Sequence, residues 1–259
     1  MITSTANQQV KLLMQLNKKG KIRDAKDLFV AEGPKMLREA PGDRLEKVYC
    51  SESFFEKYGK DPALKEVPYE VVQDSVFRAM SDTQNPQGVL CLVRQYHYTL
   101  EDLLLKEKPL LLILENLQDP GNLGTIMRTA EGAGAAGIIL SKGSVDMYNP
   151  KTIRSTMGSI YRVPFVYAEE LEGVLAFLKE RGIPSFAAHL DGKHTYDRES
   201  YEGGAAFLVG NESSGLSAGL ADLADIRIRI PMEGKLESLN ASVASSILLY
   251  EAYRQKRKS

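Results

Sequence analysis

The 259-residue sequence has no tryptophan, only two cysteines, and almost no net charge. A formal net charge of −1 gives no overall sign of a polyanionic partner, so charge has to be examined locally. The cysteines, Cys50 and Cys91, form no CxxC pair and lie within apolar runs. This placement favours buried free thiols over a disulfide, and it indicates a reducing, cytoplasmic compartment.

Long apolar runs are also missing. No run approaches the ~18 residues that a membrane span needs. The nearest candidate, LLLKEKPLLLIL, is interrupted by Lys106, Glu107 and Lys108. The amino terminus, MITSTANQQV, has no basic segment leading into an apolar core, so it does not resemble a secretion signal. The sequence therefore predicts no association with a membrane.

Histidine is scarce, and this limits the chemistry. His97, His189 and His194 form no cluster with cysteine at the spacing of metal ligands. The sequence contains no Gly-x-Ser-x-Gly elbow, no HExxH helix and no Walker sequence. We therefore expect no metal site, no serine hydrolase triad and no phosphoryl transfer from a nucleotide.

A Gly-x-Gly-x-x-Gly match is present at Gly132, Gly134 and Gly137, but its context is wrong for a dinucleotide site. Such a site needs a strand before the glycines and a helix after them. Here a strand at 109–116 and a helix at about 122–133 precede the glycines, and the apolar run GIIL follows them. The glycines are therefore interpreted as a helix stop and a tight turn into a strand.

The apolar runs divide the chain into two parts. Short runs at 28–33, 47–51, 67–72 and 88–93 predict a small α/β domain over 1–97, followed by a charged linker at 98–108. The runs in 109–259 are longer, and helical patterns separate them, which predicts a mostly parallel sheet covered on both faces. They lie at 109–116, 136–140, 162–167, 184–190, 205–212 and 225–232, and a last helix is expected at about 239–257.

A local excess of basic residues lies near the amino terminus. Residues 11–26 contain six basic side chains and one acid, Asp24. Two interpretations are open: a solvated helix face, or an arm that contacts phosphates and binds in a salt-dependent way. The candidates for phosphate contact are Lys18, Lys19, Lys21 and Arg23.

Three later segments share one form: an apolar strand, a polar turn with glycine, and then a helix. They are LILENLQDPGNLGTIMRTA, FLVGNESSGLS and RIPMEGKLESLNASVA. Ligands of open parallel sheets bind past the carboxyl ends of strands, so the three turns build one pocket if their strands are neighbours. Taken singly, each turn also has a structural interpretation. Asn122 could cap a helix, Glu212 could be a solvated acid, and Ser238 and Asn240 could cap the last helix.

Together, in this order, the turns resemble the motifs of the SpoU, or TrmH-like, RNA ribose 2′-O-methyltransferases of the SPOUT superfamily. The matching stretches are 122–130, 210–216 and 230–244. LFVAEGPKMLREA and TQNPQGVLCLV more loosely resemble the small RNA-binding domain, similar to some ribosomal proteins, that precedes many members. The second motif departs from the family at Ser213 and Ser214, where members often have a glycine, so its local loop shape is expected to differ.

The resemblance implies a fold, a cofactor and site residues. It implies S-adenosylmethionine held by a deep trefoil knot, with Gly210, Asn211, Ile230 and Leu239 at cofactor positions. It also implies a homodimer with the last helix in the interface. The apolar positions of that helix, which suit an interface or simple core packing, are Val243, Ile247, Leu248 and Tyr250.

The resemblance also assigns a central catalytic role to Arg128. Because a guanidinium is not deprotonated in proteins, we interpret Arg128 as a grip on a phosphate that also stabilises the developing alkoxide. Asn122 would orient the loop and the ribose, and the polar wall would be completed by Glu212, Ser238 and Asn240.

The predicted function is therefore 2′-O-methylation of structured RNA, with ribosomal RNA favoured because of the amino-terminal domain. Three alternatives stay open at this point: a transfer RNA 2′-O-methyltransferase, an RNA-binding module without catalysis, and a nucleotide-binding dehydrogenase. The intact polar motif positions argue against the second, and the misplaced glycines against the third.

Overall fold

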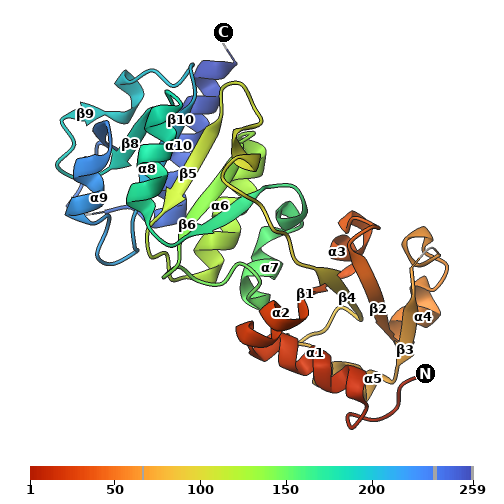
Figure 1. Ribbon diagram of the computed structural model, residues 1–259. Helices are drawn as coiled ribbons and strands as arrows, with labels where there is room; N and C mark the ends of the chain where they lie inside the picture. Colours follow the sequence, from red (N-terminus) through yellow and green to blue (C-terminus); the bar gives the residue numbers. More distant parts are fainter. Residues whose placement is uncertain (66, 236–237, 258–259) are drawn as a thin grey trace. The chain divides into compact units, whose positions relative to one another are not determined.

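The computed structural model describes residues 1–65, 67–235 and 238–257. The chain forms two compact units, shown in Figure 1. Unit 1 contains Met1–Tyr96 and Asp146–Tyr161, and unit 2 contains His97–Val145 and the chain from Arg162 onward. The division therefore differs from the boundaries expected from the sequence, because a segment from the middle of the chain belongs to the first unit.

The segment Asp146–Tyr161 is held in unit 1 by side-chain contacts. The ring of Tyr148 stacks on Phe29, with centroids 4.9 Å apart. The hydroxyl of Tyr161 donates to the carbonyl of Met36 at 3.2 Å. The expected linker at 98–108 is likewise part of unit 2, where Leu103 is buried in the core.

Unit 1 is a small α/β unit, as predicted. Its four-stranded sheet has the order β1-β4-β2-β3, in which β4 is antiparallel to both neighbours and β2 and β3 are parallel. The strands are β1 (Leu28–Glu32), β2 (Leu45–Ser51), β3 (Tyr69–Val72) and β4 (Val89–Arg94). The helices are α1 (Gln8–Lys18), α2 (Gly20–Lys26), α3 (Pro34–Glu39), α4 (Glu52–Tyr58), α5 (Asp74–Met80) and α7 (Pro150–Thr156).

The two cysteines lie on neighbouring strands inside this sheet. Cys50 and Cys91 are buried and unpaired, which confirms the expectation of free thiols. Burial raises the pKa of the Cys50 thiol to about 12. Because the thiolate is the reactive form, these thiols are inert core residues.

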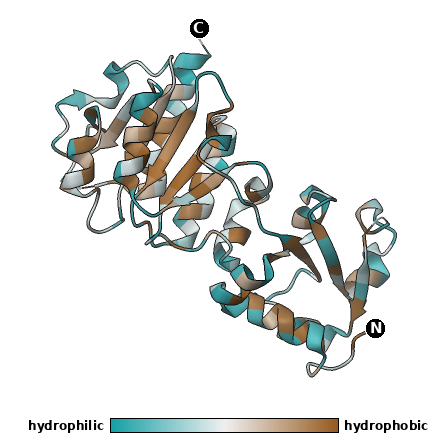
Figure 2. Ribbon diagram, viewed as in Figure 1, coloured by the Kyte–Doolittle hydropathy of each residue, from teal (hydrophilic) through white to brown (hydrophobic). Residues whose placement is uncertain are grey.

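Unit 2 is built on a seven-stranded sheet with the order β7-β6-β5-β10-β8-β11-β9, and every pairing in it is parallel. This confirms the predicted parallel sheet. The strands are β5 (Leu110–Leu114), β6 (Gly137–Ser141), β7 (Phe165–Ala168), β8 (Ser185–Ala188), β9 (His194–Thr195), β10 (Ala205–Val209) and β11 (Ile226–Arg229). Figure 2 shows the central strands as a continuous apolar layer.

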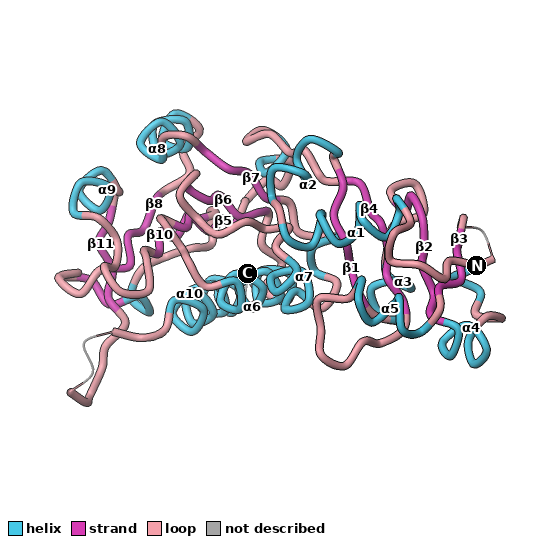
Figure 3. The backbone as a smooth tube through the Cα atoms, turned by 90° about the horizontal axis from the view of Figure 1, so that it is seen from below, coloured by secondary structure: helices cyan, strands magenta, loops and turns pink. Residues whose placement is uncertain are grey.

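Helices cover both faces of the sheet. In Figure 3, α6 and α10 lie on one side of the strands and α8 and α9 on the other. These helices are α6 (Pro120–Gly132), α8 (Leu171–Glu180), α9 (Ala218–Leu223) and α10 (Ala241–Lys256). Every residue of β5 and β10 is buried, as expected for strands covered on both faces. No helix among the described residues is long and apolar enough to cross a membrane.

The sheet brings two of the three motif strands side by side. β5 and β10 pair directly, from Leu110 with Ala205 to Leu114 with Val209. β11, the strand of the third motif, does not pair with β10, because β8 lies between them. The condition stated for one shared pocket, that the three motif strands are neighbours, is thus met by β5 and β10 and not by β11.

The glycines of the dinucleotide-like match have the structural role predicted for them. α6 ends at Gly132, Gly134 has the left-handed φ of 68°, and Gly137 begins β6. A side chain at Gly137 would place its Cβ 2.4 Å from Leu103, so this glycine permits close packing.

Candidate active site

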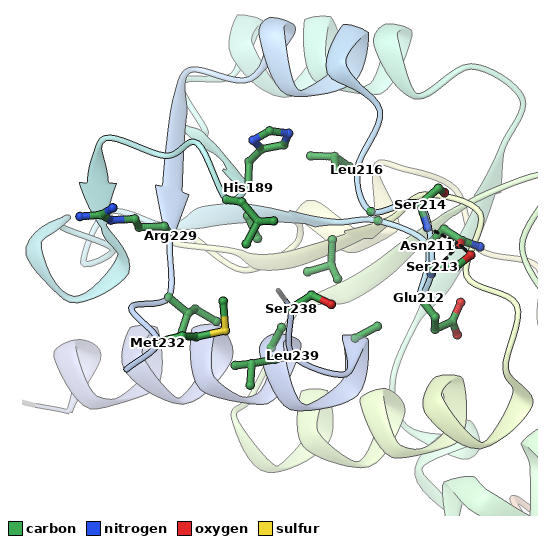
Figure 4. Close-up of a pocket in the computed structure, with 18 of the residues that line it drawn as sticks. His189, Asn211, Glu212, Ser213, Ser214, Leu216, Arg229, Met232, Ser238 and Leu239 are labelled. Atoms are coloured by element: carbon green, nitrogen blue, oxygen red, sulfur yellow. Dashed lines mark hydrogen bonds between the residues drawn. The ribbon is translucent and has the colours of Figure 1, made fainter. Parts of the chain in front are cut away.

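A pocket of about 570 Å³ lies at the carboxyl edge of the sheet of unit 2. Its lining comes from the segments that follow β8, β10 and β11 and from the start of α10, as Figure 4 shows. The volume is in the range of small-molecule and cofactor sites. The pocket thus occupies the position at which open parallel sheets bind their ligands.

The structure brings six of the nine predicted catalytic and cofactor-binding residues to this pocket. All four residues expected to bind a cofactor, Gly210, Asn211, Ile230 and Leu239, line it. Two predicted members of the polar wall, Glu212 and Ser238, line it as well. The remaining predicted catalytic residues, Asn122, Asn240 and Arg128, are not part of the lining.

One chain of hydrogen bonds joins the three motifs beside the pocket. Asn122 Nδ2 donates to Glu212 Oε1 at 3.0 Å, and Asn240 Nδ2 donates to Asn122 Oδ1 at 3.0 Å. Asn240 also caps α10, because its Oδ1 accepts from the backbone of Ser242 at 2.8 Å. The cap of α6 is Asp119 and not Asn122, so the side chain of Asn122 is available to connect the motifs.

Glu212 is the centre of this network. Its carboxylate also accepts backbone N–H groups from Gln118 at 3.0 Å and Asp119 at 2.9 Å. Partial burial acts to raise the pKa of Glu212, but the hydrogen bonds from Asn122, Asp119 and Gln118 together outweigh it and hold the pKa below its ordinary value. Glu212 is therefore an anion near neutral pH, suited to organising donors and poorly suited to taking a proton.

The loop after β10 is tightly folded, and this explains two of its residues. A Cβ at Gly210 would lie 2.1 Å from the backbone of Gly215 and Leu216, so only glycine fits. Asn211 Oδ1 accepts hydrogen bonds from the backbone and the hydroxyl of Ser213, both at 2.9 Å. Ser213 thereby takes part in the turn at the position where a glycine was expected.

Arg128 lies on an exposed face of α6. No hydrogen bond or ion pair of its guanidinium is found within the described part of the chain, and the side chain does not line the pocket. α6 packs along α10, with Thr129 Oγ1 and Ser246 Oγ 3.0 Å apart. The guanidinium of Arg128 is therefore accessible to a ligand from solution, whereas Asn122, Glu212 and Asn240 are hydrogen-bonded to one another.

The apolar positions of α10 divide between core and surface. Leu248 is fully buried, so its role is core packing. Val243 and Tyr250 keep 46% and 49% of their surface exposed, and they lie two helical turns apart on one face. Core packing therefore accounts for Leu248 but not for Val243 and Tyr250, for which the interface stays a prediction.

The four basic residues of unit 1 that were predicted to contact phosphate differ in exposure. Lys18, Lys19 and Lys21 are exposed. Arg23 is only 5% exposed, donates to the carbonyl of Leu16 at 2.5 Å and forms an ion pair with Asp146. The expectation that Arg23 contacts phosphate does not fit this position, because its charge is neutralised inside the protein.

The carboxyl end of β8 contributes residues that the sequence analysis did not assign to the site. Ala188, His189 and Leu190 line the pocket. His189 Nδ1 accepts from the backbone N–H of Asp191 at 3.2 Å, so in the neutral ring Nε2 carries the proton. The sequence offered one indication of this segment, because an apolar strand runs into a polar turn at Asp191 and Gly192. The segment was not assigned to the site because it matches none of the three family motifs.

No cluster of histidine, cysteine, aspartate and glutamate that could hold a metal is found among the described residues. The polar groups around the pocket are backbone groups, hydroxyls, the amide of Asn211, the imidazole of His189, the guanidinium of Arg229 and the carboxylate of Glu212. Such a lining fits an organic cofactor with both polar and apolar parts.

Two protein families match the sequence. Residues 109–250 match the SpoU rRNA Methylase family, and residues 7–91 match the MRM3-like substrate binding domain. The first match contains the three motifs and the pocket, and the second lies within unit 1.

Individual relatives agree with these matches. The 23S rRNA (guanosine(2553)-2'-O)-methyltransferase RlmP of Bacillus subtilis is 32% identical over 254 residues, covering 96% of this chain and 97% of its own. The AdoMet-bound rRNA methyltransferase from Sinorhizobium meliloti superposes with a TM-score of 0.86 at 32% identity, covering 98% of this chain and 97% of its own. The SpoU methyltransferase AviRb from Streptomyces viridochromogenes shares the fold, with a TM-score of 0.87 at 23% identity over 98% and 99% of the two chains.

Proposed function

This chain belongs to the SpoU rRNA Methylase family, and we propose that it transfers the methyl group of S-adenosylmethionine to a ribose 2′-hydroxyl of ribosomal RNA. The observation that carries the proposal is the network of Asn122, Glu212 and Asn240, which ties three distant motifs together at the edge of one pocket. Ribosomal RNA is favoured over transfer RNA because relatives of full length are rRNA methyltransferases and the amino-terminal part matches a substrate-binding domain.

The pocket fits S-adenosylmethionine, which supplies an electrophilic methyl group when bound. Backbone groups beside Gly210 and Asn211 would hold its polar parts, and Ile230 and Leu239 would cover the apolar faces. We propose that the chain of unit 2 forms a trefoil knot, which its membership of the SpoU rRNA Methylase family supports.

The reaction requires that the weakly nucleophilic hydroxyl be placed in line with the methyl group and lose its proton. Asn122 and Asn240 orient the polar wall. Glu212 holds Asn122 as a fixed anion, Asn122 in turn accepts from Asn240, and Ser238 presents its hydroxyl to the pocket. Arg128 grips a phosphate next to the target ribose and stabilises the oxygen as charge develops on it. Its exposure on α6 supports this role, since a phosphate can reach it.

The substrate RNA is bound by unit 1, and the protein acts as a homodimer in the cytoplasm. The exposed lysines Lys18, Lys19 and Lys21 support the first proposal. The exposed face of α10 formed by Val243 and Tyr250 supports the second. The buried free thiols of Cys50 and Cys91 agree with a reducing compartment.

The decisive experiment is ribose-methylation mapping of total RNA from cells with and without the gene. We expect one 2′-O-methyl mark in ribosomal RNA to disappear without the gene and to return when purified protein and S-adenosylmethionine are added to the unmodified RNA. A mark lost from transfer RNA instead would favour the alternative substrate. Unchanged maps together with intact cofactor binding would contradict the proposed reaction.

A further inference from the structure

The turn that follows β5 has an unusual backbone conformation at Asn116. Among the described residues, those other than glycine with a left-handed φ are Asp27, Asn116 and Met157. Asp27 and Met157 end α2 and α7, and a left-handed residue is an ordinary way to end a helix. Asn116, with a φ of 52°, instead follows a strand. Because a side chain disfavours this conformation, it persists only where the surrounding contacts enforce it.

Three adjacent strand ends supply the contacts that hold Asn116. The hydroxyl of Ser141, the last residue of β6, accepts from the backbone N–H of Asn116 at 2.8 Å and donates to Asn116 Oδ1 at 3.2 Å. From the loop after β10, Asn211 Nδ2 donates to the carbonyl of Asn116 at 2.8 Å. Gln118 Nε2 donates to the same carbonyl at 3.1 Å. Asn116 therefore joins the carboxyl ends of β6, β5 and β10, which are neighbours in the sheet.

This junction directs the chain toward the network of Glu212. Shortly after Asn116, the backbone N–H groups of Gln118 and Asp119 donate to the Glu212 carboxylate at 3.0 Å and 2.9 Å. Asp119 then caps α6, the helix of the first motif. In the second motif, Asn211 directly precedes Glu212. The turn of the first motif is thus attached to two successive residues of the second, and Asn116 makes one of the two attachments.

We propose that Asn116 is a positioning residue for methyl transfer, which acts by keeping the N–H groups of Gln118 and Asp119 on Glu212. Asn116 does not line the pocket, so the role involves no contact with the cofactor. The proposal rests on the proposed function and deepens it, because the network of Glu212 is the feature that carries that function. The sequence analysis assigned no role to Asn116, which lies before the matching stretch at 122–130.

The test changes the backbone preference at Asn116 in the full-length protein. A β-branched side chain strongly disfavours a positive φ, whereas glycine adopts it without strain. The substrate is unmodified ribosomal RNA from cells without the gene. At saturating RNA and S-adenosylmethionine, we expect Asn116→Val to lower single-turnover methyl transfer by about tenfold, because the hydrogen bonds to Glu212 are lost.

The glycine variant shows whether the left-handed conformation is what matters. Asn116→Gly should keep transfer within about threefold of the unaltered protein, because glycine retains the turn and the carbonyl. Cofactor affinity, measured by calorimetry, should be unchanged in both variants. Equal transfer by the valine and glycine variants would overturn the proposal.

Met157 offers a matched control in unit 1. Its φ of 51° is close to that of Asn116, and its side chain is 45% exposed. Met157→Val should lower the urea midpoint, as Asn116→Val does, but leave transfer by the folded protein unchanged. A loss of transfer in Met157→Val as large as that in Asn116→Val would overturn the proposal, because it would show an effect of stability alone.

Action through Glu212 has its own readout. In the Glu212→Gln background, Asn116→Val should lower transfer by no more than about twofold, because the carboxylate that receives the N–H groups is already absent. Two losses of about tenfold that multiply in the double variant would contradict this route, since independent sites have additive free energies.

Ser141→Ala tests the same junction without changing the backbone preference of Asn116. It removes the hydroxyl that bonds Asn116, and it should lower transfer by about threefold. Amide hydrogen exchange at Gln118 and Asp119 should be faster in this variant, and that measurement needs no methyl transfer. Unchanged transfer or unchanged exchange would overturn the proposal. Failure of the proposed function would appear instead as absent transfer by the unaltered protein, whatever the exchange rates.

Discussion

Two arginines that look alike in the sequence have opposite environments in the two units. Arg23 of unit 1 is 5% exposed, bonded to a backbone carbonyl and paired with Asp146. Arg128 of unit 2 is exposed on α6. A buried guanidinium is committed to the fold because leaving it unpaired would be costly, whereas an exposed one can exchange water for a phosphate.

Glu32 of unit 1 and Glu212 of unit 2 also differ in environment. Glu32, at the end of β1, is 8% exposed and accepts from Ser81 Oγ at 2.7 Å and Thr83 Oγ1 at 3.1 Å. Glu212 accepts hydrogen bonds from a similar number of donors, but it borders the pocket of about 570 Å³. The number of hydrogen bonds does not distinguish them. The difference is that Glu212 organises groups that face a space large enough for a cofactor and Glu32 fixes a loop.

The largest expected effect belongs to Arg128. Arg128→Lys should lower single-turnover methyl transfer at saturating RNA by about a hundredfold, because a point charge on a flexible stem cannot reproduce a planar fork. Cofactor affinity should hardly change, since Arg128 does not line the pocket. Near-normal transfer by the lysine variant would make Arg128 an ordinary surface residue of its helix.

The second effect is on stability and belongs to unit 1. Asp146→Asn leaves the buried charge of Arg23 without its partner, and we expect the free energy of unfolding to fall by about 2 kcal/mol. This lies below the usual cost of breaking a buried pair because the Asp146 side chain is 37% exposed. Urea denaturation measures it, and cofactor affinity of the folded variant is the control. An unchanged urea midpoint would mean that solvent already screens the ion pair of Arg23 and Asp146.

The two glutamates should separate function from stability. Glu212→Gln keeps the shape but loses the anion, so we expect methyl transfer to fall about tenfold while the free energy of unfolding at neutral pH falls by only about 0.5 to 1 kcal/mol. Glu32→Gln should reverse the pattern, with a stability loss of about 1 to 2 kcal/mol and methyl transfer within about twofold of the unaltered protein. Equal effects of both variants on transfer would remove the distinction drawn between the two sites.

The smallest effect is a pH dependence of stability. Since the folded-state pKa of Glu212 is lowered, its stabilising contribution is present above the ordinary pKa of 4.5 and is lost as the pH falls through the folded value. The stability difference between the unaltered protein and Glu212→Gln should therefore be constant near neutrality and shrink below about pH 4.5. A difference that stays constant down to pH 3 would show that the carboxylate is not held by this network.

Much of the fold could be predicted from local pattern. The runs from 28–33 to 88–93 became β1 to β4, and the apolar run at 109–116 became β5. The glycines after α6 were predicted as a turn, and Gly134 has the left-handed φ that such a turn requires. The cofactor positions, from Gly210 to Leu239, came from the resemblance, and the structure gathers them at one pocket. Their roles stay predictions.

The sequence by itself determined which segments are strands and helices and which turns carry polar groups, because periodicity and turn chemistry act over a few residues. Only the tertiary structure decided that β8 separates β10 from β11, that His189 borders the pocket, and that Arg23 pairs with a residue 123 positions away. The physical reason is that strand order and ion pairing depend on contacts between distant segments. A charged residue has the same local signature whether it faces solvent or a buried partner.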